Sequence, residues 1–113
     1  MAQNSNLLRG TLDLLILKAL TWKPLHGYGV SEWISSVTDG SLLMEEGTLY
    51  PALHRLQGKG WIESEWGLSE NNRRAKYYRL TREGIRHLAV EADSWVRYTN
   101  VVARALALES PQP

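Results

Sequence analysis

Hydrophobic positions recur at helical spacing along much of this chain. Residues 7–22 carry leucine on nearly every side of a helix, so such a helix must be covered from more than one direction. Residues 27–37 repeat apolar side chains every three or four positions, and a polar stretch containing Gly40 closes them. The pattern predicts two helices with a break at Pro24, because proline disfavours helical geometry in the residue before it.

A third helix is predicted over residues 46–59, and its two faces differ. One face is aliphatic and is expected to be buried: Leu49, Ala52, Leu53 and Leu56. The opposite face is small and smooth: Gly47, Pro51, His54 and Gly58. Pro51 is tolerated because it lies near the helix start, where backbone N–H groups lack partners within the helix.

The chain then changes from helical spacing to alternation. Residues 61–66 and the tyrosine-rich residues 75–80 are predicted to form a hairpin. The polar loop between them, residues 67–74, contains Asn71 and Asn72, which suit a turn, and it ends in two arginines. Residues 42–44 are long enough only for a strand fragment.

The last helical stretch has the most regular spacing. Thr81 is expected to cap a helix over residues 82–108, which would be about 40 Å long. Its apolar positions alternate spacings of three and four, a seam that normally packs against another helix. These positions are Ile85, Leu88, Ala92, Trp95, Thr99, Val102 and Leu106.

This order of elements predicts a winged helix-turn-helix, mainly α with a small β-hairpin wing. In that design the third helix enters the DNA major groove and the hairpin loop reaches neighbouring phosphates. We therefore expect residues 1–81 to form a DNA-binding domain, residues 82–108 a dimerisation helix and residues 109–113 a flexible tail.

Composition agrees with one small domain. The chain has 113 residues and no cysteine, which removes disulfides and cysteine metal sites. Its longest unbroken apolar run, residues 14–17, is too short to span a membrane, so we expect a cytoplasmic protein without membrane contact. A domain of this size buries only about two thirds of its unfolded surface, so a second copy would add useful burial.

The net charge of +1 conceals a basic segment. Residues 55–86 hold eight Arg or Lys against four Glu, whereas the rest of the chain is net acidic. Segregated positive charge is typical of polyanion binders. The candidates for DNA contact are Thr48, Tyr50, His54 and Arg55 on the third helix, and Arg73, Arg74 and Lys76 at the loop. Ordinary alternatives are a solvated turn for the loop cations and a core edge for Tyr50.

Three segments resemble the signature blocks of the PadR family of bacterial transcriptional regulators, in its short form with one C-terminal helix. They are LHGYGV at 25–30, EGTLYPALHRLQGKGWI at 46–62 and RRAKYYRLTREG at 73–84. The resemblance implies a dimeric winged-helix regulator, usually a repressor, in which the final helix packs near the partner's first helix. Two such subunits would read a near-palindromic operator in double-stranded DNA.

The resemblance also implies residue roles. Tyr28 and Tyr50 match the family's DNA-facing tyrosines, and Arg74 and Lys76 match its wing cations. Trp95 lies where some members stack an aromatic residue on planar apolar effectors; Ala92, Val96 and Thr99 around it are small enough to leave space or to let two helices pack closely. The residues expected at the dimer interface are Leu8, Leu12, Leu15, Ile85, Leu88, Trp95, Val102 and Leu106.

Other functions fit the residues less well. The three histidines are isolated, and no phosphate loop or nucleophile elbow is present, so we expect neither an enzyme nor a metal or other cofactor. A winged helix that only binds proteins stays open, because fold does not fix function. Four tryptophans are interpreted as packing residues, since the chain has no phenylalanine: Trp22, Trp33, Trp61 and Trp66.

Overall fold

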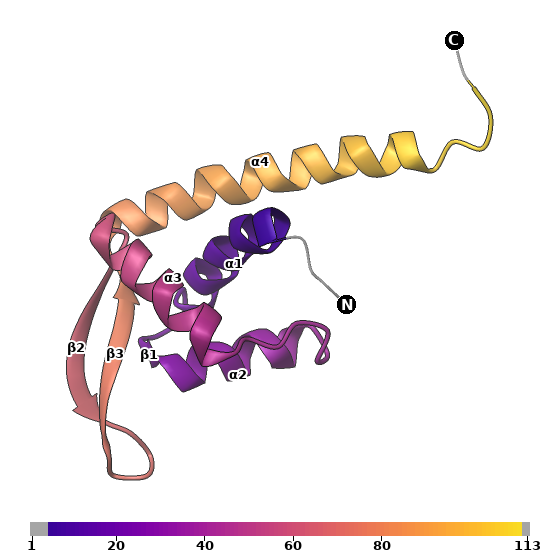
Figure 1. Ribbon diagram of the computed structural model, residues 1–113. Coiled ribbons are helices and arrows are strands. Elements are labelled where there is room, and N and C mark those ends of the chain that lie inside the picture. The colour runs from indigo at the N-terminus through magenta and orange to yellow at the C-terminus, as the bar shows by residue number, and fades with distance from the viewer. Residues whose placement is uncertain (1–4, 112–113) are drawn as a thin grey trace.

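The computed structural model describes residues 5–111 of the chain and the side chains from Gly10 to Pro111. Its long last helix lies across the other helices, and a hairpin extends away from them (Figure 1). In chain order the elements are α1 (Ser5–Ala19), β1 (Leu25–His26), α2 (Gly27–Val37), α3 (Glu46–Gly58), β2 (Ile62–Leu68), β3 (Arg74–Leu80) and α4 (Arg82–Leu106).

The core lies where α1, α2 and α3 meet. The predicted aliphatic face of α3 is fully buried there, which confirms the interpretation of its spacing. Because α3 is held by this face, its small face points outward. The largest fully buried side chains are Ile16, Leu17, Val30, Ile34, Leu49, Leu53, Leu56 and Ile62.

The sheet contains three antiparallel strands in the order β1-β3-β2, and its short strand is not where the sequence placed it. Residues 42–44 form no strand, whereas Leu25 pairs with Tyr78 along the free edge of β3. The prediction at 42–44 is wrong because Leu42 and Met44 pack against the helical core, while Leu43 is exposed. Met44 is buried there, and its carbonyl accepts a hydrogen bond of 3.2 Å from the Ser31 hydroxyl.

Local chemistry fixes the hairpin turn and the start of α4. Asn72 adopts a left-handed φ of 60°, and the Ser69 N–H donates to the carbonyl of Arg73 at 2.9 Å. The Thr81 hydroxyl oxygen accepts a hydrogen bond of 3.0 Å from the Gly84 N–H and so caps α4. The turn and the cap both confirm the sequence prediction.

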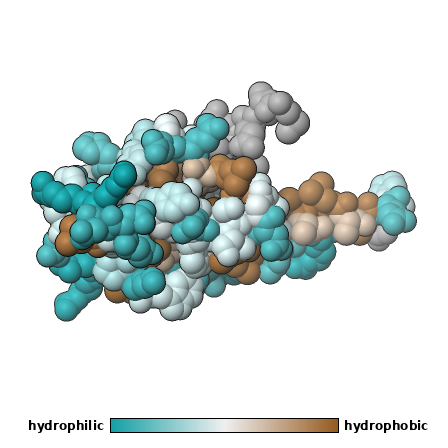
Figure 2. All heavy atoms as spheres, turned by 90° about the horizontal axis from the view of Figure 1, so that it is seen from below, coloured by the Kyte–Doolittle hydropathy of each residue, from teal (hydrophilic) through white to brown (hydrophobic). Residues whose placement is uncertain are grey.

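The last helix ends at Leu106 rather than at residue 108, and it projects beyond the other helices (Figure 1). The radius of gyration is 16.4 Å, above the roughly 13 Å typical of a compact domain with about 100 residues. The projecting part carries hydrophobic residues (Figure 2), and the exposed ones on α4 include Val96, Tyr98, Val101 and Leu106.

Together these elements form the mainly helical winged helix-turn-helix that the sequence predicts. Within residues 5–111, no helix combines the length and the apolar character needed to cross a lipid bilayer.

Candidate nucleic-acid interface

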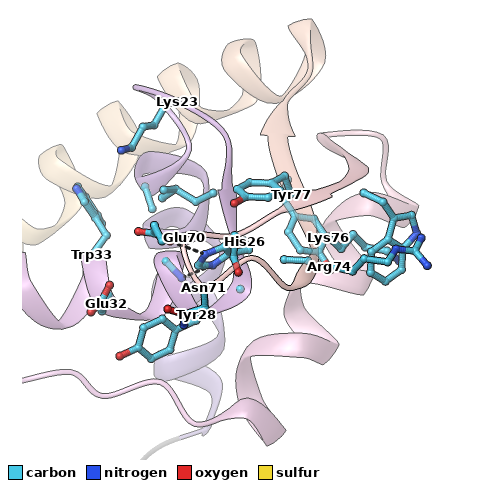
Figure 3. Close-up of a pocket in the computed structure, with 18 of the residues that line it drawn as sticks. Lys23, His26, Tyr28, Glu32, Trp33, Glu70, Asn71, Arg74, Lys76 and Tyr77 are labelled. Carbon is cyan, nitrogen blue, oxygen red and sulfur yellow. Dashed lines mark hydrogen bonds and ion pairs between the residues drawn. The ribbon is translucent and has the colours of Figure 1, made fainter.

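An open groove of about 1500 Å³ is lined by the segment from the end of α1 to β1, by α2, by Tyr50 of α3 and by the hairpin (Figure 3). Four residues singled out in the sequence line it: Tyr28, Tyr50, Arg74 and Lys76. Hydrophilic side chains also gather at the hairpin end of the face shown in Figure 2. The fold therefore brings candidate contacts from three separate segments to one surface.

Both tyrosines are open to solvent at this groove. Tyr28, in the first turn of α2, is 67% exposed, and Tyr50 is 44% exposed, so neither is a core residue. Tyr50 lies directly against Gly27, where a Cβ atom would be only 2.6 Å from the phenol oxygen. A glycine at position 27 is therefore what allows the ring to pack against the start of α2.

The outward face of α3 is as smooth as its sequence predicts. Thr48 and His54 are exposed, together with Pro51. Gly47 and Gly58 have no neighbouring atom within 4 Å of where a Cβ would lie. Few side chains would therefore hold this helix away from the floor of a DNA groove.

Arg55 has a different role from the one that the sequence suggests. Its guanidinium donates a hydrogen bond to the carboxylate of Asp13, and this ion pair joins α3 to α1. The side chain is only 33% exposed. We therefore remove Arg55 from the candidate DNA contacts. The sequence could not show this role, because the two residues are 42 positions apart.

The wing cations lie beside an aromatic ring. Trp66 on β2 is opposite Lys76 on β3. The Arg74 guanidinium carbon is 4.6 Å from the centroid of the indole ring, and the Lys76 Nζ is 5.6 Å from it. Arg73 is exposed at the end of the turn. Among the residues that the structure describes, no carboxylate forms an ion pair with these three cations.

Arg79 lies on the same strand as Arg74 and Lys76 but, unlike them, forms ion pairs with carboxylates of the described residues. Its guanidinium donates to the Glu63 carboxylate at 2.8 Å and lies 3.7 Å from Glu65. The hydrogen bond to Glu63 raises the pKa of the Arg79 guanidinium. Arg79 is thus already paired within the sheet, so the basic segment does not act as one uniform patch.

Two tryptophans expected to be packing residues lie at the surface. Trp66 is 56% exposed and Trp22 is 63% exposed. The prediction is wrong for Trp66 because the hairpin extends past the core, and for Trp22 because it follows the last turn of α1. Trp33 and Trp61 do pack against the core, as expected.

His26 is a residue of this surface that the sequence interpretation missed, because histidine is not among the favoured N-cap residues. Its Nδ1 accepts a hydrogen bond of 3.0 Å from the Gly29 N–H and caps α2. Its Nε2 lies 3.6 Å from the Glu70 carboxylate in the wing turn, and its ring centroid is 5.2 Å from that of Tyr77 (Figure 3). Hydrogen bonding to the Glu70 backbone N–H, and then to His26, lowers the pKa of the Glu70 carboxyl. His26 therefore ties the wing turn to α2.

A second hollow, of about 520 Å³, lies between α1 and α4, and Trp95 lines it. Trp61 and His87, on its wall, stack with ring centroids 3.6 Å apart. The three small residues predicted near an effector do not line this hollow: Ala92 and Thr99 are half-buried and Val96 is exposed. The Thr99 hydroxyl donates to the carbonyl of Trp95 at 2.9 Å.

The residues predicted at a dimer interface differ in how far their own chain buries them. Leu12 is buried in the core of its own chain, so we withdraw it from the interface. Leu15 and Leu88 are partly buried against the same core. Leu8 lies outside the residues whose side chains are described. The remaining positions on α4 keep exposed surface: Ile85, Trp95, Val102 and Leu106.

The chain is similar to several known proteins. Residues 16–90 match the family model described as Transcriptional regulator PadR-like family. An uncharacterized protein from Lysinibacillus sphaericus is 34% identical over 98 residues, which are 87% of this chain and 90% of that protein. All the residues that line the groove lie within the matched range.

Solved structures extend the similarity to the fold. A transcriptional regulator from Clostridium thermocellum is 34% identical with a TM-score of 0.78, and the alignment covers 88% of this chain and 96% of that one. A PadR-like transcriptional regulator from Bacillus cereus is 28% identical with a TM-score of 0.79, and the alignment covers 92% of this chain and 99% of that one.

Proposed function

Because this chain belongs to the PadR-like family of transcriptional regulators, we propose that it is a homodimeric repressor that binds a near-palindromic operator in double-stranded DNA. The observation that supports DNA binding best is the groove. There, exposed tyrosines from α2 and α3 and wing cations that pair with no carboxylate among the described residues line one surface. The small outward face of α3 is exposed as well. The family consists of regulators rather than enzymes.

In this proposal α3 enters the major groove with its small face forward. Thr48 and His54 are the side chains placed to reach base edges or sugars, and Tyr28 and Tyr50 contact the backbone beside them. Arg73, Arg74 and Lys76 neutralise phosphates alongside the wing. Residues 1–81 act as the DNA-binding unit.

The dimer forms through residues 82–108. The exposed hydrophobic residues of α4 need a cover that the described part of one chain does not provide, and a second α4 with the partner's α1 would supply it. Two recognition helices on one face of DNA are expected about 34 Å apart, one helical turn. Repression then depends on this spacing.

An effector is the regulatory part of the proposal. A small planar apolar molecule would stack on Trp95 in the hollow between α1 and α4. It would release DNA only by binding more tightly to a dimer whose recognition helices are wrongly spaced.

A salt titration tests DNA binding. We expect the wild-type protein to bind a labelled duplex, with affinity falling steeply as salt rises. The double substitution Arg73→Ala and Arg74→Ala should weaken binding to all sequences and reduce the log-log slope by about 0.9 for each lost phosphate contact. Arg79→Ala is the matched control, because that cation is paired within the sheet.

Unchanged affinity of the double variant would refute the role of the wing. A wild-type protein that forms no DNA complex even at low salt would instead indicate a winged helix that binds only proteins.

A further inference from the structure

Trp66 has a place on the wing that packing does not explain. Alternation along β2 puts it on the same side of the hairpin as Ile62, which is buried in the core. The hairpin leaves the core between these two positions, so that side becomes surface at Trp66. A large exposed indole there needs another reason.

Arg74 and Lys76 supply that reason. Both cations lie within about 6 Å of the ring centroid, the range in which a positive charge is attracted to the face of an indole. Lys76 is the direct cross-strand neighbour of Trp66, and Arg74 is two residues further along the same side of β3. One ring therefore orients both side chains.

An aromatic ring orients a cation without neutralising it. A carboxylate in the same place would hold the cation too, but it would compete with a phosphate for the charge, as Glu63 does at Arg79. Arg and Lys are otherwise long and flexible, and ordering them on binding lowers affinity. An indole that orders them beforehand removes part of that cost.

The side of the hairpin away from Trp66 is stabilised by contacts of its own. The Tyr77 hydroxyl donates to the carbonyl of Leu68 at 2.9 Å. Gly67 accommodates the Tyr77 ring, since a Cβ there would be 3.1 Å from it. His26 packs against the same ring. The fold of the wing therefore does not depend on the exposed indole.

We propose that Trp66 is a positioning residue for DNA binding, whose indole holds Arg74 and Lys76 ready to meet the phosphate backbone. The proposal rests on the DNA-binding function proposed above. It predicts that the indole matters only while the two cations are present, and that another aromatic ring replaces it better than an aliphatic side chain does.

The experiment is a double-mutant cycle, measured as the dissociation constant for a labelled duplex of random sequence at low salt. Trp66→Leu should weaken binding about fivefold to tenfold, as expected if the ring removes part of the cost of ordering two long side chains. Trp66→Phe should stay within about threefold of the wild type, because it keeps a ring face. In the Arg74→Ala, Lys76→Ala background, Trp66→Leu should have no further effect.

Trp22→Leu is the matched control. Trp22 is also exposed and also has a lysine over its ring, Lys18 at 5.1 Å, and it lines the same groove, but the cation that its ring holds is neither Arg74 nor Lys76. Any effect of its replacement on DNA affinity should therefore be the same in the wild-type and the Arg74→Ala, Lys76→Ala backgrounds. If the Trp66→Leu variant melts below the wild type, Trp66→Met takes its place in the cycle, since Met is also apolar and has no ring.

The outcomes separate the two proposals. Wild-type affinity in Trp66→Leu, with weak binding in the Arg74→Ala, Lys76→Ala protein, overturns the role of Trp66 but leaves the DNA-binding function intact. An equal loss from Trp66→Leu in both backgrounds also overturns it, because the indole would then act independently of the cations. Failure of the wild-type protein to bind overturns the DNA-binding function itself.

Discussion

Gly84 is the glycine at which an added methyl group should disturb the structure most. It is buried in the first turn of α4, against the turn that follows α3. A Cβ atom there would lie 2.0 Å from the carbonyl oxygen of Trp61 and 3.2 Å from a methyl of Leu80. Ordinary contact begins at 3.4 Å, so Gly84→Ala would force the two backbones apart by about 1.4 Å.

The loss of stability can be worked from the contacts at this junction. Overpacking costs about 1–3 kcal/mol. The same carbonyl of Trp61 accepts the Thr81 N–H at 3.0 Å, and losing a hydrogen bond of this kind costs about 1 kcal/mol. Alanine returns up to about 1 kcal/mol through its higher helix propensity. We therefore expect the free energy of unfolding to fall by about 1–3 kcal/mol.

Thermal unfolding followed by circular dichroism tests this, with all proteins at the same concentration because a dimer's Tm depends on it. A loss of about 2 kcal/mol should lower the Tm by roughly 10 °C. Gly58→Ala is the control, since that helical glycine has open space around it, and its Tm should stay equal or rise. A Gly84→Ala protein that melts at or above the wild-type temperature would refute the close contact with Trp61.

Two further predictions concern the groove and its underlying core. Gly27→Ala should displace the flexible ring of Tyr50 rather than any backbone atom, so the Tm should change little. DNA affinity should fall about fivefold, equivalent to ~1 kcal/mol. A wild-type affinity would contradict the contact between Tyr50 and Gly27. Burial, with a smaller effect from Tyr50, raises the pKa of the Tyr78 phenol above 10.0. The folded state therefore favours the neutral phenol, and its stabilising effect is complete below pH 10 and is lost as pH rises through the higher folded pKa. In urea unfolding between pH 8 and about 11, the free energy of unfolding should fall more steeply with pH for the wild type than for Tyr78→Phe. Equal slopes for the two proteins would be inconsistent with the raised pKa of Tyr78.

The helices could be predicted because each follows a local rule. Spacing alone identified the buried face of α3 from Leu49 to Leu56, and an N-cap threonine marked the start of α4. The basic, tyrosine-rich hairpin was also recognisable, because alternation and turn residues act over a few positions. Whatever depends on neighbours in the chain was therefore accessible from the sequence.

Contacts between residues that are far apart in the sequence could not be predicted from it. The strand at Leu25 exists only because β3 offers it a free edge, and nothing in two residues indicates that pairing. Arg55 looked available for DNA until the fold placed Asp13 beside it. Trp66 looked like core because hydrophobicity does not say where a hairpin leaves the core.

By itself, then, the sequence determined which segments become helices and which form the hairpin, which of their faces are apolar and where positive charge gathers. The tertiary structure alone decided which cations remain unpaired and which aromatic rings stay exposed. The physical reason is range: helical and strand periodicity act over a few residues, whereas burial and ion pairing depend on which surfaces the chain brings together through space.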